Sequence, residues 1–272
     1  MNNINNISIG VIGAGNMSTA IIKGILSEDL IPSKNIWVYD IDQSKLDTIV
    51  ENTYIQGANN NNQLVEKSNI IILAVKPNIY PSILEEITPY LTSSKILISI
   101  AAGISIKFIN DKIKKRCKVV RIMPNTPALV GYGVIALCKN HELDEKELEY
   151  VISIFKCLGK IEEVDETLIN AVTGVSGSGP AYVYMFIEAL ADGGVMMGLP
   201  RDQAYRMAAQ TVLGAAKMVL DTKEHPGVLK DAVCSPGGTT VEAVYTLEQS
   251  GFRGIIMDAV KKCTEKGELL TK

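Results

Sequence analysis

Histidine and cysteine are scarce in this sequence, which contains two histidines and five cysteines. The cysteines form no Cys-x-x-Cys pair, and neither histidine lies close to a pair of them, so no metal site is expected. An odd number of cysteines without the spacing of a disulfide framework indicates free thiols in a reducing compartment. We therefore predict a cytoplasmic protein.

Long hydrophobic runs and an excess of basic residues are also missing. The longest apolar runs, such as 70–75, are far too short to span a bilayer. Residues 1–6 have no cationic start and no cleavage site, which indicates a polar lead into a strand and not a signal peptide. A net charge of −3 and a pI near 5.6 argue against a nucleic-acid partner. Neither a membrane nor a nucleic acid is an expected partner.

What the sequence does have is apolar material for a core, since hydrophobic residues make up 47% of the chain. Over residues 1–164, short apolar runs alternate with helical patterns. Unbroken apolar strands separated by helices are typical of a parallel sheet covered on both faces. We predict an α/β Rossmann-type doubly wound domain, with strands at 7–12, 36–39, 70–75, 96–100, 119–123 and 134–138.

The pattern changes near residue 165, after which no convincing strand is found. Residues 165–272 are predicted to form an all-α C-terminal domain, with helices at 180–197, 201–221, 227–233, 239–249 and 252–268. The segment 203–220 is apolar nearly all round, which a helix tolerates only when most of its sides are buried. A helical domain that contains such a helix suggests burial against a second subunit, so we expect a homodimer or a higher homo-oligomer.

A dinucleotide-binding fingerprint lies at the first predicted strand and helix. Gly13 permits a tight turn, Gly15 lets a pyrophosphate approach the backbone, and Ser18 takes the third, small position. The start of the helix offers free N–H groups and a positive dipole end. We predict NAD(H) or NADP(H) as the cofactor, bound here by Ile12, Gly13, Ala14, Gly15, Asn16 and Met17.

Asp40 follows the second predicted strand. A carboxylate there would accept hydrogen bonds from the ribose hydroxyls and repel a 2′-phosphate, which favours NAD. No arginine is nearby to bind that phosphate, although Ser44 and Lys45 could partly do so. The alternative is that Asp40 only caps the following turn.

The loops after the later strands face the same crevice, because ligands bind at the carboxyl ends of parallel strands. Small residues there leave room for a nicotinamide ring. The alternative is that these loops are ordinary strand-ending turns. The additional cofactor-binding residues predicted in these loops are Ala74, Val75, Lys76, Pro77, Ala101 and Ala102.

Two glycine-rich stretches mark the C-terminal half. At 173–180 the chain enters a helix with Pro180 in its first turn; the alternative here is a flexible hinge. At 235–241, Ser235 is predicted as an N-cap and Pro236 as the first helical residue, with Gly237 and Gly238 exposing N–H groups. This arrangement suits a small anion such as a carboxylate, unless it is only an ordinary capped helix.

Together these motifs resemble those of the pyrroline-5-carboxylate reductases. The matching stretches are Gly-Ala-Gly-Asn-Met at 13–17, Ala-Val-Lys-Pro at 74–77, Met-Pro-Asn-Thr-Pro at 123–127, Gly-Ser-Gly-Pro-Ala-Tyr at 177–182 and Ser-Pro-Gly-Gly-Thr-Thr at 235–240. The resemblance covers essentially the whole chain. It implies a Rossmann domain, a helical domain that forms an intertwined dimer, and reduction of 1-pyrroline-5-carboxylate to L-proline by NADPH or NADH.

The resemblance also implies roles for single residues. Asn61 resembles the asparagine that contacts the adenosine side of the cofactor. Many members of the family have a neutral or phosphate-accepting residue where this chain has Asp40. This difference argues against a preference for NADPH. The residues that resemble the substrate loop are Ser235, Gly238, Thr239 and Thr240.

Thr240 is the predicted catalytic residue, as a hydrogen-bond partner of the imine nitrogen that relays its proton. A protonated imine is already electrophilic, so the reaction needs no strong acid and no histidine. Holding the hydride donor and acceptor in contact, with water excluded, should be the main source of catalysis.

Two other functions remain open at this point. A hydroxyacid dehydrogenase of the same two-domain plan would use a helical lysine, and Lys217 is the candidate, although a surface ion pair with Asp221 is an alternative. A nucleotide-sensing regulatory protein would need the Rossmann half but offers no reason for the 235–240 motif.

Overall fold

The computed structural model describes residues 7–271, so the predicted polar lead at 1–6 lies outside the described residues. Contacts along the chain divide it into two compact units. Within the described residues, unit 1 comprises 7–177 together with 263–271, and unit 2 comprises 178–262. The predicted domain boundary between 164 and 165 marks where strands give way to helices, and it stays a prediction.

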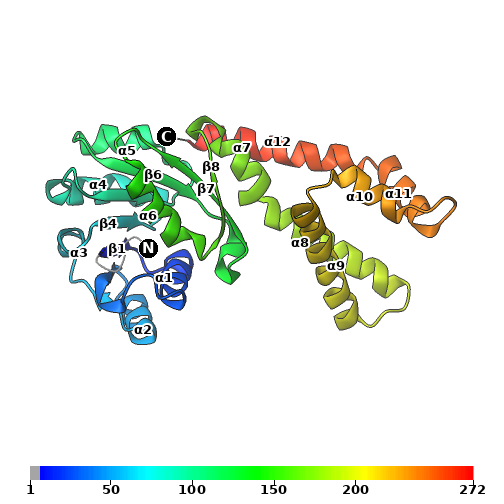
Figure 1. Ribbon diagram of the computed structural model, residues 1–272, viewed down its shortest axis with the longest axis horizontal. Helices are drawn as coiled ribbons and strands as arrows, with labels where there is room; N and C mark the ends of the chain where they lie inside the picture. Colours follow the sequence, from blue (N-terminus) through cyan, green and yellow to red (C-terminus); the bar gives the residue numbers. More distant parts are fainter. Residues whose placement is uncertain (1–6, 272) are drawn as a thin grey trace. The chain divides into compact units, whose positions relative to one another are not determined.

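Unit 1 is built on one sheet with the strand order β3-β2-β1-β4-β5-β6-β7-β8 (Figure 1). All neighbouring strands are parallel except β6 and β7. The central strands β1, β4 and β5 are buried along their whole length, which is why they are unbroken apolar runs. The strands are β1 Ile9–Ile12, β2 Ile36–Tyr39, β3 Gln56–Gly57, β4 Ile70–Leu73, β5 Ile96–Ser99, β6 Lys118–Met123, β7 Gly133–Lys139 and β8 Gly159–Glu163.

Helices cover both faces of this sheet and enclose two hydrophobic cores. One core lies between the sheet and α1 Asn16–Ser27, α2 Gln43–Thr53 and α6 Glu145–Lys156. The other lies between the sheet and α3 Asn61–Lys67, α4 Tyr80–Ile87 and α5 Ile106–Ile113. Alternate residues of a strand point to opposite faces, so Val11 belongs to the first core and Ile12 to the second. The predicted doubly wound α/β domain is confirmed.

Two parts of the sheet differ from the prediction. Strand β7 runs antiparallel to β6, because the connection from Met123 to Gly133 is too short for a crossover between parallel strands. The edge strands β3 and β8 were not predicted. The first has two residues, and the second is polar apart from Ile161, so neither contains an apolar run.

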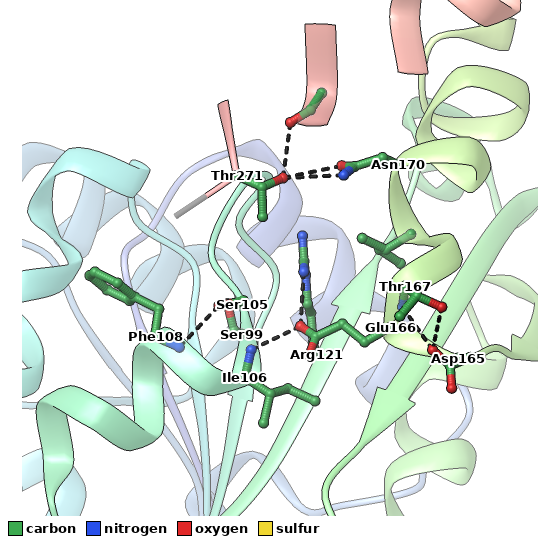
Figure 2. A network of polar contacts seen from close by, with 12 residues as sticks. Ser99, Ser105, Ile106, Phe108, Arg121, Asp165, Glu166, Thr167, Asn170 and Thr271 are labelled. Carbon is green, nitrogen blue, oxygen red and sulfur yellow. Dashed lines mark hydrogen bonds and ion pairs between the residues drawn. The ribbon is translucent and has the colours of Figure 1, made fainter. Parts of the chain in front are cut away.

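A polar network ties the later part of unit 1 together (Figure 2). Arg121 of β6 is almost fully buried and donates to Glu166 Oε1 at 2.9 Å. The same oxygen accepts from the Ile106 N–H at 2.8 Å, at the start of α5. Further along the chain, Asn170 of α7 Ile169–Val172 hydrogen-bonds the Thr271 hydroxyl at 3.3 Å. The segment 263–271 is thereby joined to unit 1.

Unit 2 is entirely helical within the described residues, as predicted. Its own core is small and consists of Ala191, Ala204 and Ala208, where α8 packs on α9. None of the helices described in either unit is long and apolar enough to cross a membrane. The helices are α8 Gly179–Met196, α9 Arg201–Thr222, α10 Pro226–Val233, α11 Thr239–Gln249 and α12 Phe252–Leu270, the last of which ends in unit 1.

Candidate active site

The turn between β1 and α1 has the geometry that the glycine fingerprint predicts. Gly13 has a φ of +104°, and its N–H donates to the Tyr39 carbonyl at 2.8 Å. A Cβ at this position would lie 2.6 Å from the Ala74 carbonyl oxygen, so only glycine fits without a shift. The turn is therefore wedged between the carboxyl ends of β2 and β4.

Gly15, unlike Gly13, is not crowded by neighbouring atoms, and a bound dinucleotide needs this open space. A Cβ at Gly15 would meet nothing within 4 Å, so the space in front of the helix is open. Gly15 is also the N-cap of α1, whose first turn has neither a side-chain cap nor an acidic residue. The first N–H groups of α1 are free of side-chain caps and suit a pyrophosphate. Ser18 is buried beneath the turn, as the small third position requires.

The other predicted cofactor loops lie at the same edge of the sheet. Ile12, Leu73 and Ser99 are in register across β1, β4 and β5, so the loops that follow these strands begin side by side. The Ala74 N–H donates to the Ile12 carbonyl at 2.9 Å. Ala101 is buried and Ala102 is exposed. The structure thus brings residues 12–17, 74–77 and 101–102 to one edge.

Asp40 is bonded to the turn itself. Its Oδ2 accepts from the Ala14 N–H at 2.7 Å, and its Oδ1 accepts from the Asp42 N–H at 2.9 Å. These contacts fit the alternative role of Asp40 as a turn cap. Each carboxylate oxygen can accept a second hydrogen bond, so this geometry also allows a ribose contact.

Asp42, which the sequence analysis did not single out, lies just before Ser44 and Lys45 at the start of α2. It is the N-cap of α2, and its Oδ1 accepts from the Ser44 N–H at 3.1 Å and the Ser44 hydroxyl at 2.7 Å. Its Oδ2 lies 3.3 Å from Lys45 Nζ. Hydrogen bonds from Ser44 and Lys45 hold the pKa of Asp42 below its usual range. The aspartate two residues before a serine and a helical pattern was the available signal.

Asn61 is more deeply buried than Asp40. It is buried at the start of α3, and its Nδ2 donates to Glu86 Oε2 at 2.9 Å. Its Oδ1 is buried without a hydrogen-bond partner among the described residues. A buried amide oxygen without a partner is the kind of group that a bound ligand satisfies. Its contact with the adenosine side of the cofactor stays a prediction.

Asn125, in the 123–127 motif, has a structural role. Its Nδ2 donates to the Ser176 carbonyl at 2.9 Å, and its Oδ1 accepts from the Val134 N–H at 3.0 Å. Ser176 belongs to a π-helical turn at Thr173–Gly177, a regular element where the flexible hinge was the alternative. The amide therefore fixes the loop after β6 to this turn.

The N-cap prediction for the 235–240 stretch was wrong, whereas the predicted helix at 239–249 is confirmed. The helix α11 begins at Thr239 with Gly238 as its N-cap, so Ser235 is not the cap and Pro236 is not the first helical residue. Residues 235–238 form a turn in which the Gly238 N–H donates to the Ser235 carbonyl at 3.0 Å. Gly237 has a φ of +65°, which ends any helical path, and proline before such a glycine is typical of a type II turn.

The substrate-loop residues remain together at the start of the predicted helix, with Gly238 in place of Ser235 as the N-cap. Gly238 contributes no side chain as a cap, so the first N–H groups of α11 have no side-chain acceptor. Thr239 is exposed and Thr240 is partly buried in this first turn. The structure thus gathers Ser235, Gly238, Thr239 and Thr240 around an end that suits an anion.

Lys217 and His225, outside these regions, both make local contacts. Lys217 Nζ lies 2.5 Å from Asp221 Oδ2 on an exposed face of α9, which is the surface ion pair of the alternative interpretation. His225 is the N-cap of α10, and its Nδ1 accepts from the Gly227 N–H at 3.0 Å. No cluster of metal-binding side chains occurs within residues 7–271.

Comparison with known proteins covers both halves of the chain. Residues 166–270 match the family described as pyrroline-5-carboxylate reductase dimerisation, and residues 8–103 match the family described as NADP oxidoreductase, coenzyme F420-dependent. The pyrroline-5-carboxylate reductase of Escherichia coli (strain K12) is 46% identical over 264 residues, which are 97% of this chain and 98% of that protein. The chain belongs to the pyrroline-5-carboxylate reductase family.

Solved structures of the same family agree. The pyrroline carboxylate reductase of Plasmodium falciparum, which was solved with NADP bound, has a TM-score of 0.89 and 37% identity, covering 99% of this chain and 100% of that one. The enzyme of Coxiella burnetii has a TM-score of 0.93 and 32% identity, covering 98% and 100%. The predicted family, fold class and nicotinamide-dependent reductase class are confirmed.

Proposed function

We propose that this chain reduces the C=N bond of 1-pyrroline-5-carboxylate with NADH or NADPH and releases L-proline. The observation that carries the proposal is that family similarity extends over 97% of the chain and includes both compact units. The nicotinamide supplies the hydride when the cofactor is bound. The open space at Gly15 and the uncapped start of α1 are what the chain offers to the pyrophosphate.

The remaining cofactor contacts are proposals argued from position. Residues 12–17, 74–77 and 101–102 lie at the carboxyl edge of the sheet, where dinucleotides bind in doubly wound folds. Asp40 lies against the same turn, and Asn61 offers a buried amide oxygen that is still free to accept. We assign these residues to the cofactor.

The substrate is assigned to the start of α11. Its N–H groups would bind the carboxylate, with Ser235, Gly238 and Thr239 shaping the turn around it. Thr240 lies one residue further into the helix, and its hydroxyl would hydrogen-bond the imine nitrogen. Its pKa is too high for it to act alone as an acid, so orientation is its larger contribution.

Residues 165–272 are proposed as the substrate and dimerisation domain, through which a homodimer or larger homo-oligomer forms. Unit 2 has a core of three alanines, too little apolar burial for a stable unit of this size. Large apolar side chains are instead exposed in the isolated chain, among them Met185, Leu213, Met218, Leu220, Ile255 and Met257. A second copy would bury them. The net charge of −3 and the free thiols support the absence of a nucleic-acid partner and a cytoplasmic location.

The test is cofactor oxidation by the purified protein, followed by nicotinamide absorbance, with and without 1-pyrroline-5-carboxylate. Oxidation that depends on the imine supports the proposal. Thr240→Ala should lower kcat by about 10- to 100-fold and leave cofactor affinity unchanged. The matched control is Thr246→Ala on the same helix, whose hydroxyl donates to the Glu242 carbonyl at 3.0 Å and should not affect kcat. A wild-type kcat in Thr240→Ala would refute the assignment.

A further inference from the structure

The loop from β2 to α2 contains two side chains that could bind a 2′-phosphate, Ser44 and Lys45. Both are already engaged by one carboxylate. Asp42 accepts from the Ser44 hydroxyl at 2.7 Å and lies 3.3 Å from Lys45 Nζ. It also accepts from the Ser44 and Lys45 N–H groups, the first donors of α2. Asp42 thus already binds the Ser44 hydroxyl, the Lys45 ammonium group and the first N–H groups of α2.

A second carboxylate stands directly before this group. Asp40 accepts hydrogen bonds from the Ala14 N–H, in the turn between β1 and α1, and from the Asp42 N–H. A ribose 2′-hydroxyl can donate to such a carboxylate, whereas a phosphate is an anion and only accepts. The pKa of Asp42 lies below the usual range of aspartate, because Ser44 and Lys45 donate hydrogen bonds to it, so its carboxylate is charged at neutral pH.

Lys23 is the other cation of this region, since it lines the same hollow of about 320 Å³ as Gly15 and Lys45. Lys23 lies eight residues after Gly15 on α1, which places it about 12 Å along the helix from the turn. A phosphate on a ribose held by Asp40 would therefore meet the Asp42 group first.

We propose that Asp42, together with Asp40, makes this chain select NADH over NADPH, with Asp42 acting by neutralising Lys45 and occupying the start of α2. The inference rests on the proposed function as far as the cofactor is a nicotinamide dinucleotide. It assigns to Asp42 a role in specificity and to Lys45 a role that appears only when Asp42 is removed.

The test measures binding without any imine, so that it is independent of turnover. The dissociation constants of NADH and NADPH are determined by titration calorimetry on the full-length protein. NADPH should bind wild type on the order of 10-fold more weakly than NADH, as expected for an added anion beside two carboxylates in water. NADPH binding as tight as NADH binding would overturn the proposal.

Asp42→Asn is the informative variant, because asparagine is as good an N-cap as aspartate and only the charge is lost. NADPH should then bind about 10-fold more tightly, with NADH affinity within about twofold of wild type. Lys45→Ala should have little effect on NADPH in wild type and a clear weakening effect in Asp42→Asn. An unchanged NADH to NADPH ratio in Asp42→Asn would overturn the proposal.

Asp144→Asn is the matched control. Asp144 is also an N-cap aspartate, on α6, where it accepts from the Glu147 N–H at 2.8 Å. The proposal expects both dissociation constants to stay at their wild-type values in this variant. A shift like that of Asp42→Asn would mean a general effect of net charge and would overturn it. Loss of imine-dependent oxidation with selective NADH binding intact would instead count against the proposed function alone.

Discussion

Removing the Glu166 carboxylate should strongly destabilise unit 1. Its partner Arg121 has a side chain that is only 3% exposed, whereas the Glu166 side chain is 29% exposed. Glu166→Ala would leave a buried guanidinium without its carboxylate and would also remove the acceptor of the Ile106 N–H. Breaking a buried ion pair on one side costs about 3–5 kcal/mol, and the partial exposure of Glu166 places the loss near the lower figure.

The assay uses the single tryptophan of the chain. Trp37 lies in β2, so its fluorescence reports the unfolding of unit 1. A loss of about 3 kcal/mol in a unit of this size should lower the melting temperature by about 6–12 °C. Glu166→Gln keeps an acceptor for Ile106 and should cost about 1–2 kcal/mol.

The matched control is Glu163→Ala, three residues earlier. Glu163 pairs with Lys139 at 3.2 Å, but the two side chains are 51% and 30% exposed, and such surface pairs contribute about 0–1 kcal/mol. A second comparison replaces both Arg121 and Glu166 by apolar residues of similar volume, which should recover most of the stability that Glu166→Ala loses. If Glu166→Ala cost no more than Glu163→Ala, the reasoning from burial would be refuted.

Three further predictions concern unit 1. Tyr80→Phe removes the hydroxyl that donates to the Leu73 carbonyl at 2.7 Å and should cost about 1 kcal/mol in urea unfolding; no change in the midpoint would contradict this. Gly159→Ala should cost about 1–3 kcal/mol or more, because Gly159 has a φ of +145° and a Cβ would lie 2.0 Å from the Gly133 carbonyl oxygen, whereas Gly57→Ala makes only ordinary contacts and should cost far less by the same assay. Stability should fall as pH rises from about 9 to 11, because three cysteine thiols lose their protons in the unfolded chain and keep them in the folded chain. Urea midpoints should decline over this pH range, and they should decline less when the three cysteines are replaced by alanine. The thiols whose pKa burial raises from 9.0 to about 11 are Cys117, Cys138 and Cys157.

The central strands could be predicted because burial on both faces leaves an unmistakable apolar run. The run at 70–75 ends as strand β4 at Leu73, two residues early, since Ala74 already turns toward Gly13. Edge strand β8 has no such pattern, because only one of its sides must be apolar. Its pairing depends on the φ of Gly159, which no periodicity records.

A residue of the candidate site could be predicted where only one backbone geometry fits its sequence pattern. It was harder to predict where the same pattern fits two geometries. The pattern at Gly13 fits only a tight turn in which glycine has a positive φ. Ser235 and Pro236 suit a capped helix and a type II turn equally well, and the choice depends on the positive φ of Gly237. Asp42 was missed because an N-cap is usually only a structural feature, and its contact with Lys45 needs the folded loop.

The return of residues 263–271 to unit 1 has a consequence for biosynthesis. These residues leave the ribosome only after all of 178–262, so the hydrogen bond between Asn170 and Thr271 forms late. A nascent chain that ends anywhere within unit 2 carries the strands of unit 1 with Gly103 still lacking its neighbour Leu270. Unit 2 is in effect an insertion into unit 1, and complete folding of the dinucleotide-binding half must await synthesis of the helix that returns to it.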